Sequence, residues 1–127
     1  MGPCMETAQL VVDLMELSVS MHKLHLKISG PGSYAAHKAL NEFYDSMPGI
    51  VDNVAEQYQG AREKLLEYPQ VKPLSCNTVQ EAIGHLRDAY NKTTELQKLM
   101  PFSEVTNQLD EIKSLISSTK YKLMFLS

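Results

Sequence analysis

Residues 25–56 read HLKISGPGSYAAHKALNEFYDSMPGIVDNVAE, and this stretch decides the fold. The segment Ser29-Gly30-Pro31-Gly32 ends one apolar pattern of helical period, and a second pattern begins just after it. Glycine and proline disrupt helices and favour tight turns. The stretch therefore predicts two antiparallel helices joined by a short turn.

The rest of the chain continues the helical pattern on both sides of this hairpin. Apolar residues recur every three or four positions, and no run alternates as a half-buried strand would. We expect a single four-helix domain over residues 1–127, with helices at about 6–29, 33–66, 79–98 and 103–126. The predicted fold class is therefore all-α, a four-helix bundle.

The expected helix starts depend on capping residues. Thr78 and Glu81 have capping-box spacing at the start of the third helix. Ser33 and Ser103 are expected to cap the second and fourth helices. The segment Met1-Gly2-Pro3-Cys4 resembles a leader remnant and is expected to lie outside the first helix.

Pro48 interrupts the second helical pattern. Proline lacks a backbone donor and clashes with the preceding turn, so a kink is expected there. The apolar phase continues across the proline, which favours one bent helix over two. The alternative is a second helix with Pro48 in its first turn and Ser46 near its cap.

Composition narrows the function classes. The 127 residues carry a net charge of −3 and have no lysine- or arginine-rich tail, which argues against DNA as a partner. No apolar run has the length of a membrane span, and no signal peptide is seen. Cys4 and Cys76 lack the spacing of a disulfide framework or a zinc finger, so a reduced, cytoplasmic setting is expected.

Two histidines and two carboxylates are the candidate site. His25 lies five residues before the Gly-Pro-Gly segment and His37 five after it, so the two side chains can converge in the hairpin. Neutral imidazoles bind divalent transition metals, iron among them. Asp52 and Glu56 are four residues apart and share one helix face. The alternative is a polar seam of hydrogen-bonded histidines beside a solvated acidic pair.

Helix geometry separates the histidines from the carboxylates. Asp52 is 15 residues beyond His37, which is about 22 Å along a helix. The four residues therefore cannot hold one ion within a single chain. In a homodimer whose chains pack antiparallel about a two-fold axis, His25 and His37 of one chain can meet Asp52 and Glu56 of the other, which makes two identical sites.

The segment HLKISGPGSYAAH followed by D-x3-E resembles the ferritin-like Dps family (DNA-binding proteins from starved cells). The closing segment KSLISSTKYKLMFLS is similar in placement to the last helix of that family. Compact ferritin-like proteins of tailed phages look closer still, particularly in the YKL ending. The resemblance implies a ferritin-like bundle that binds Fe at a ferroxidase site between two chains, in a homodimer or larger homo-oligomer. It also implies that His25 and His37 supply nitrogens, Glu56 bridges or chelates, and Asp52 neutralises charge.

Two positions depart from the Dps pattern. Asn41 stands where the family usually has an aspartate, and Leu26 where it usually has a tryptophan. Asn41 offers a carbonyl oxygen without charge, so it is expected to be an outer ligand that holds iron more weakly. His22 is expected at the rim rather than as a ligand. The alternative function is a ferritin-like interaction or scaffold protein that has lost the chemistry.

Overall fold

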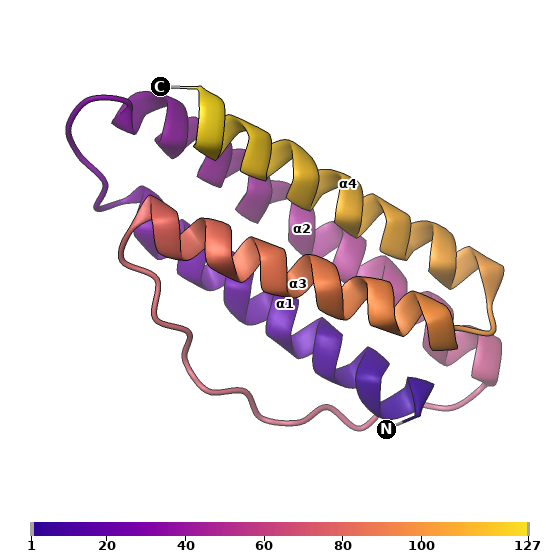
Figure 1. The fold of residues 1–127 in the computed structure, drawn as a ribbon. Coiled ribbons are helices and arrows are strands. Elements are labelled where there is room, and N and C mark those ends of the chain that lie inside the picture. Colours follow the sequence, from indigo (N-terminus) through magenta and orange to yellow (C-terminus); the bar gives the residue numbers. More distant parts are fainter. Residues whose placement is uncertain (1, 127) are drawn as a thin grey trace.

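The computed structural model describes residues 2–126, and these residues form four helices and no strand (Figure 1). The helices are α1 (Pro3–His25), α2 (Ser33–Arg62), α3 (Val79–Leu99) and α4 (Ser103–Phe125). The prediction of an all-α, four-helix fold is confirmed.

The helices pack as a four-sided bundle. α1 contacts α2 and α3, and α4 contacts the same two helices, so α1 and α4 lie on one diagonal. Short turns join α1 to α2 and α3 to α4, which makes both pairs antiparallel. Residues 63–78, called the connector below, run back along the bundle between the end of α2 and the start of α3 (Figure 1). The topology therefore has one long crossover connection.

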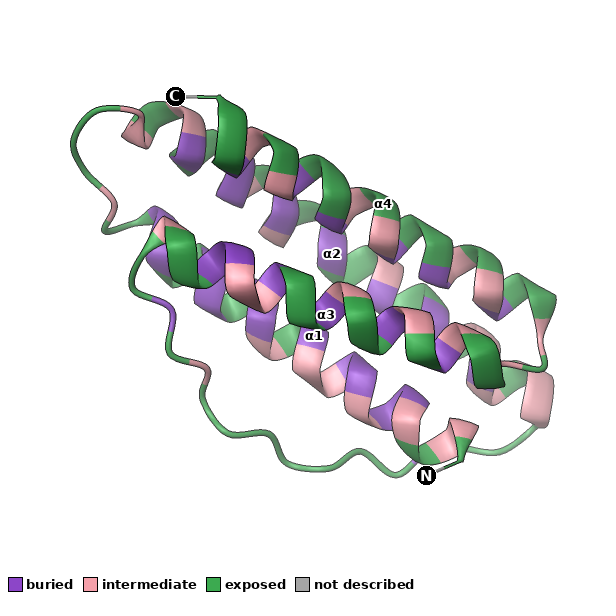
Figure 2. Ribbon diagram, in the orientation of Figure 1, coloured by how far each residue is buried: buried purple, intermediate pink, exposed green. Residues whose placement is uncertain are grey.

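One apolar core fills the space between the four helices (Figure 2). The largest side chains with essentially no exposed surface come from all four helices: Leu14, Met21, Leu24, Leu40, Phe43, Met47, Leu86, Leu96, Leu109, Ile112 and Ile116. Ser18, Thr93 and Thr119 are buried but donate to carbonyls four residues earlier in their own helices, which satisfies their hydroxyls. Burial of this core is the main stabilising term.

The first and second helices differ in extent from the prediction. Pro3 and Cys4 belong to α1, so the expectation that they lie outside it is wrong. Proline suits the first turn of a helix, and the Cys4 thiol lies 3.1 Å from the Tyr58 hydroxyl of α2. α2 ends at Arg62 because Glu63 takes a left-handed conformation (φ 55°) that stops the helix.

The capping predictions have a mixed outcome. Thr78 accepts a hydrogen bond from the Glu81 N–H at 3.1 Å, as the capping box predicts. Ser33 and Ser103 are the first helical residues rather than caps, and neither helix has a side-chain cap. Gly32 instead precedes α2 in a left-handed conformation (φ 80°) that glycine adopts at no steric cost.

Pro48 lies inside α2, which runs as one helix from residue 33 to residue 62. The favoured interpretation of a single helix is therefore the one that the structure has. The alternative with a separate helix beginning at Pro48 is wrong.

The connector has no helix of its own between residues 65 and 77, but it is tied to the bundle. The backbone of Leu74 bonds to both Glu16 and Ser20 of α1, and His85 of α3 donates to the Ser75 carbonyl at 2.7 Å. Cys76 is buried. The later part of the connector therefore covers the groove between α1 and α3, and its first part passes beside Met5 and Ala8 near the start of α1.

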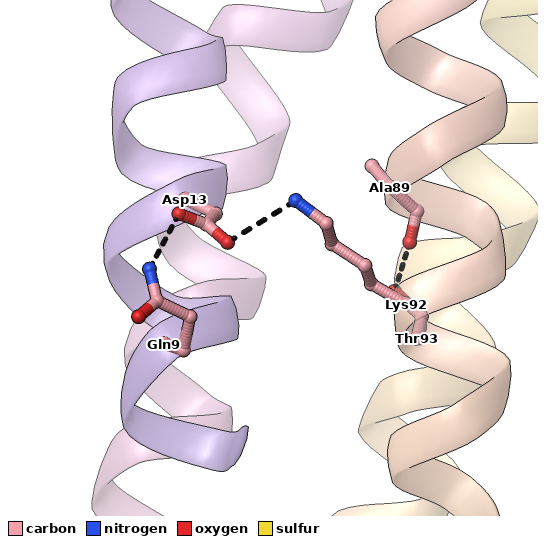
Figure 3. A network of polar contacts seen from close by, with 5 residues as sticks. All are labelled: Gln9, Asp13, Ala89, Lys92 and Thr93. Atoms are coloured by element: carbon pink, nitrogen blue, oxygen red, sulfur yellow. Dashed lines mark hydrogen bonds and ion pairs between the residues drawn. The ribbon is translucent and has the colours of Figure 1, made fainter. Parts of the chain in front are cut away.

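A polar network bridges α1 and α3 further along the bundle (Figure 3). Gln9 donates to Asp13 at 2.9 Å, and Lys92 of α3 lies 3.5 Å from the same carboxylate. Asp13 thus links α1 to α3, and Glu16 links it to the connector. None of the four helices, within residues 2–126, combines the length and apolar character needed to cross a membrane.

Candidate metal centre at the α1–α2 hairpin

The hairpin brings His25 and His37 together, as their spacing predicts. Their ring centroids are 4.3 Å apart and the rings are stacked at 26°. His25 is buried, with 8% of its surface exposed, whereas His37 on the flank of α2 is exposed. The two rings form the centre of the candidate site.

Both histidines are oriented by the main chain. The Nδ1 atom of His25 lies 2.7 Å from the His22 carbonyl, and that of His37 lies 2.8 Å from the His25 carbonyl. A carbonyl oxygen only accepts, so each Nδ1 carries hydrogen and donates. In the neutral imidazole the free lone pair is then on Nε2, which is the usual second-sphere arrangement of a metal-binding histidine.

Two neighbours complete the cluster: His22, which the sequence places at the rim, and Tyr44, whose part in the site the sequence does not predict. The His22 ring stacks flat on the Tyr44 ring, with centroids 3.9 Å apart and planes at 6°. The Tyr44 hydroxyl lies 3.0 Å from His25 Nε2 and 2.5 Å from the Asn41 carbonyl oxygen. The signal that could have found them is spacing, because His22 is one turn from His25 and Tyr44 one turn from Asn41.

The Tyr44 hydroxyl has a single hydrogen and two acceptors. Asn41 donates from its amide nitrogen to Asp45 at 3.1 Å, which directs its carbonyl oxygen toward the hydroxyl. His25 Nε2 is the competing acceptor. Desolvation of the phenol and, second, the charge of Asp45 raise the pKa of Tyr44, so the hydroxyl keeps its hydrogen near neutral pH. The hydroxyl oxygen, the Asn41 carbonyl oxygen and His25 Nε2 therefore share a single hydrogen.

The carboxylates lie elsewhere. Asp52 and Glu56 are exposed on α2, the helix that also carries His37, so the separation of about 22 Å along that helix holds. Within residues 2–126, no three histidine, cysteine or acidic side chains converge closely enough to hold a metal ion. A single chain thus presents two oriented imidazoles at one end of α2 and two carboxylates further along it.

The comparisons with known proteins give a family but no function. Residues 25–123 match a family of unknown function (DUF5856). The chain is also 28% identical, over 112 residues that cover 87% of it and 81% of the relative, to an "Uncharacterized 14.6 kDa protein in mobD-ri intergenic region" of Enterobacteria phage T4. No solved structure matches. The phage relative agrees with the expected likeness to phage proteins. Because the family match covers all of α2 and α3 and most of α4, the chain belongs to this family of unknown function.

Proposed function

We propose that this chain is a Dps-like metal-binding protein that binds Fe(II) at a site shared between two copies. The observation that carries the proposal is the orientation of His25 and His37. Both donate Nδ1–H to main-chain carbonyls, which puts the lone pair of each neutral ring on Nε2, although that of His25 also lies 3.0 Å from the Tyr44 hydroxyl. A polar seam without a ligand would not require both rings to have the same arrangement.

The residues of this chain fit such an ion in part. His25 and His37 offer neutral nitrogen, and Glu56 and Asp52 of a second copy would add oxygen and negative charge. The Tyr44 hydroxyl contacts both Asn41 and His25, so Asn41 is close to His25 without touching it. This position suits an outer ligand. A ferrous ion held there would supply one electron in an oxidation; the protein's part is to orient the donors and to balance the charge.

Connectivity supports a ferritin-like relationship. The bundle has one long crossover between its second and third helices, as ferritin-like folds do. We also expect α2 to bend at Pro48, because this residue lacks the N–H that would bond the Tyr44 carbonyl. The two free thiols, Cys4 and Cys76, support a reducing, cytoplasmic setting.

The test is metal loading of the purified protein and two variants. Wild type should take up one metal ion per chain and oxidise Fe(II) in air, since a two-fold dimer makes two equal sites. Glu56→Ala and His37→Ala should abolish both while keeping the helical content. Glu95→Ala, which removes an exposed carboxylate of α3, is the matched control and should behave as wild type. Unchanged Fe(II) oxidation in both site variants would refute the proposal.

A second candidate function is favoured by the contact between His25 and Tyr44. The lone pair that a metal needs lies 3.0 Å from a hydroxyl, and the family's usual aspartate is replaced by Asn41. These features fit a ferritin-like bundle that acts as an interaction or scaffold protein without metal chemistry. Elemental analysis after aerobic Fe(II) loading separates the two, because this candidate predicts no stoichiometric metal.

A further inference from the structure

The end of α4 carries apolar side chains that point away from the core. Tyr121 and Phe125 are 56% and 67% exposed, and Met124 and Leu126 beside them are 46% and 45% exposed (Figure 2). The Tyr121 and Phe125 rings lie one helical turn apart, with centroids separated by 5.8 Å. A surface helix normally carries polar residues on this side. These four residues, called the α4 patch below, form an apolar surface at one end of the bundle.

This end of α4 is also the basic part of an acidic protein. Residues 112–127 contain three lysines and no acidic residue. The rest of the chain holds the other nine basic residues and all 15 acidic ones, a net charge of −6. The net charge of −3 for the whole chain therefore conceals a positive segment, and this segment contains the α4 patch.

The three lysines lie on both sides of the patch. Lys122 reaches toward α2, where it pairs with Glu42. Lys113 and Lys120 lie on the α3 side, with their ammonium groups 4.9 Å and 5.4 Å from the centre of the Tyr90 ring. Within residues 2–126, neither of these two lysines forms an ion pair. Their charge is therefore available to an anionic partner.

The same kind of surface continues onto the first turns of α2, which packs beside α4. Tyr34 is exposed there, and the Lys38 ammonium group lies 5.7 Å from the centre of its ring. Lys38 is one turn before Glu42, the partner of Lys122, so it lies next to the end of α4. Aromatic and cationic side chains thus adjoin one another on both helices.

We propose that this end of the bundle docks on the surface of an anionic lipid membrane, with the α4 patch among the headgroups and the lysines against lipid phosphates. Aromatic residues beside lysine are the composition that membrane–water interfaces favour. A lysine stem can lie along apolar lipid while its ammonium group stays in water. The docking is peripheral, with the helices against the membrane surface rather than across it.

A membrane accounts for both the charge and the apolar side chains. A nucleic acid would attract the lysines but leave Met124 and Phe125 in water, because phosphate and sugar cover its outer surface. A lipid surface takes both, since its anionic headgroups lie directly above the acyl chains. The carboxylate of Glu104, in the first turn of α4, is about 30 Å along the helix from Phe125 and stays clear of the lipid. The inference goes beyond the proposed metal site and does not rest on it.

The first test is sedimentation of the purified protein with vesicles in a buffer that contains a chelator. Wild type should bind vesicles of phosphatidylcholine with about one third phosphatidylglycerol, and should not bind phosphatidylcholine alone, because the lysines require anionic lipid. Added salt should weaken the binding. No binding to the anionic vesicles, or equal binding to both kinds, would overturn the proposal.

Two variants locate the surface, each with a control at the opposite end of the bundle. Phe125→Ser should weaken binding at least about ten-fold, because it removes the most exposed side chain of the patch, whereas Leu65→Ser, at a 78% exposed position of the connector, should not. Lys120→Gln should weaken binding about five-fold, and Lys64→Gln should not. All four should keep the helical content of wild type. Equal losses in a variant and its control would contradict docking through the α4 patch.

The second test does not depend on a loss of binding. The chain has no tryptophan, so Phe125→Trp provides a single fluorophore in the α4 patch. Its emission should shift to the blue when the anionic vesicles are added, because the indole ring leaves water. Leu65→Trp, the control, should show no shift. Any other pattern would overturn the proposed orientation on the membrane.

Other occupants of the patch would give different results. If Phe125→Ser lowers the mass of an oligomer in the absence of lipid, the patch joins copies of this chain. If a single-stranded oligonucleotide or inorganic phosphate binds through Lys120 and vesicles do not, the lysines form a phosphate site without a membrane. Either result would overturn the membrane assignment. Glu56→Ala should bind vesicles as wild type does, so the metal site and the docking surface fail separately.

Discussion

Removal of one oxygen atom, in Tyr44→Phe, should lower the stability of the apo protein without weakening its affinity for a metal. The phenylalanine ring keeps the flat stacking on His22 at 3.9 Å but loses the hydroxyl beside His25 and Asn41. Asn41 loses the hydroxyl that donates to it at 2.5 Å, and the Nε2 atom of His25, a residue that is 8% exposed, loses a polar neighbour at 3.0 Å. An unsatisfied buried acceptor costs about 1–2 kcal/mol.

The apo protein should therefore unfold at lower urea concentration. With an m-value of about 2 kcal/mol per molar urea, a loss of 1.5 kcal/mol moves the midpoint by roughly 0.7 M. Binding of a divalent metal should become tighter or stay equal, because the hydroxyl no longer competes for the lone pair of His25. Tyr34→Phe is the control on the same helix, since Tyr34 is 73% exposed, and it should leave both measurements unchanged. Weaker metal binding in Tyr44→Phe would refute this reasoning and make the hydroxyl itself a ligand.

Two further predictions concern stability away from the site. Thr78→Ala should lower the free energy of unfolding in urea by about 1 kcal/mol, because the Glu81 N–H loses its side-chain acceptor. Thr78→Ser should recover most of this loss. Equal stability of the wild type and the alanine variant would show that the cap contributes nothing. Burial, with the Cys4 contact second, raises the pKa of Tyr58 to about 12. The folded state then favours the neutral phenol, so this stabilisation is complete below pH 10 and is lost as pH rises toward 12. Unfolding measured from pH 9 to 12 should show a smaller decline in Tyr58→Phe than in wild type.

The sequence predicted the fold because its signals were local and agreed. The Gly-Pro-Gly turn, the apolar period and the Thr78 cap each depend on residues within a few positions of one another. The helix ends were less accurate, since α2 stops at Glu63, a residue that rarely adopts the left-handed conformation it takes here. α1 begins at Pro3, where proline suits the first turn of a helix, and its start also makes a contact between Cys4 and Tyr58, 54 residues apart, that no local pattern shows.

In the candidate site too, one part followed from local spacing and another part did not. The approach of His25 and His37 followed from their equal distances to the turn, and the structure places the two rings 4.3 Å apart. The part played by Tyr44 did not follow, because a tyrosine at helical spacing is usually a core residue. Its hydroxyl becomes important only through the rotamers of His25 and Asn41, which depend on packing between two helices.

The proposed pairing of two copies bears on the choice between the two candidate functions. In such a pair the carboxylates of one copy come near the histidines of the other whether or not a metal is present. The dimer alone therefore cannot distinguish a metal centre from a charge-matched protein interface. What distinguishes them is the lone pair of His25: in a metal centre it binds the ion, and in an interface it accepts from Tyr44. The Tyr44 hydroxyl, 3.0 Å from His25 Nε2 and 2.5 Å from the Asn41 carbonyl oxygen, is therefore the group whose removal separates the two candidates.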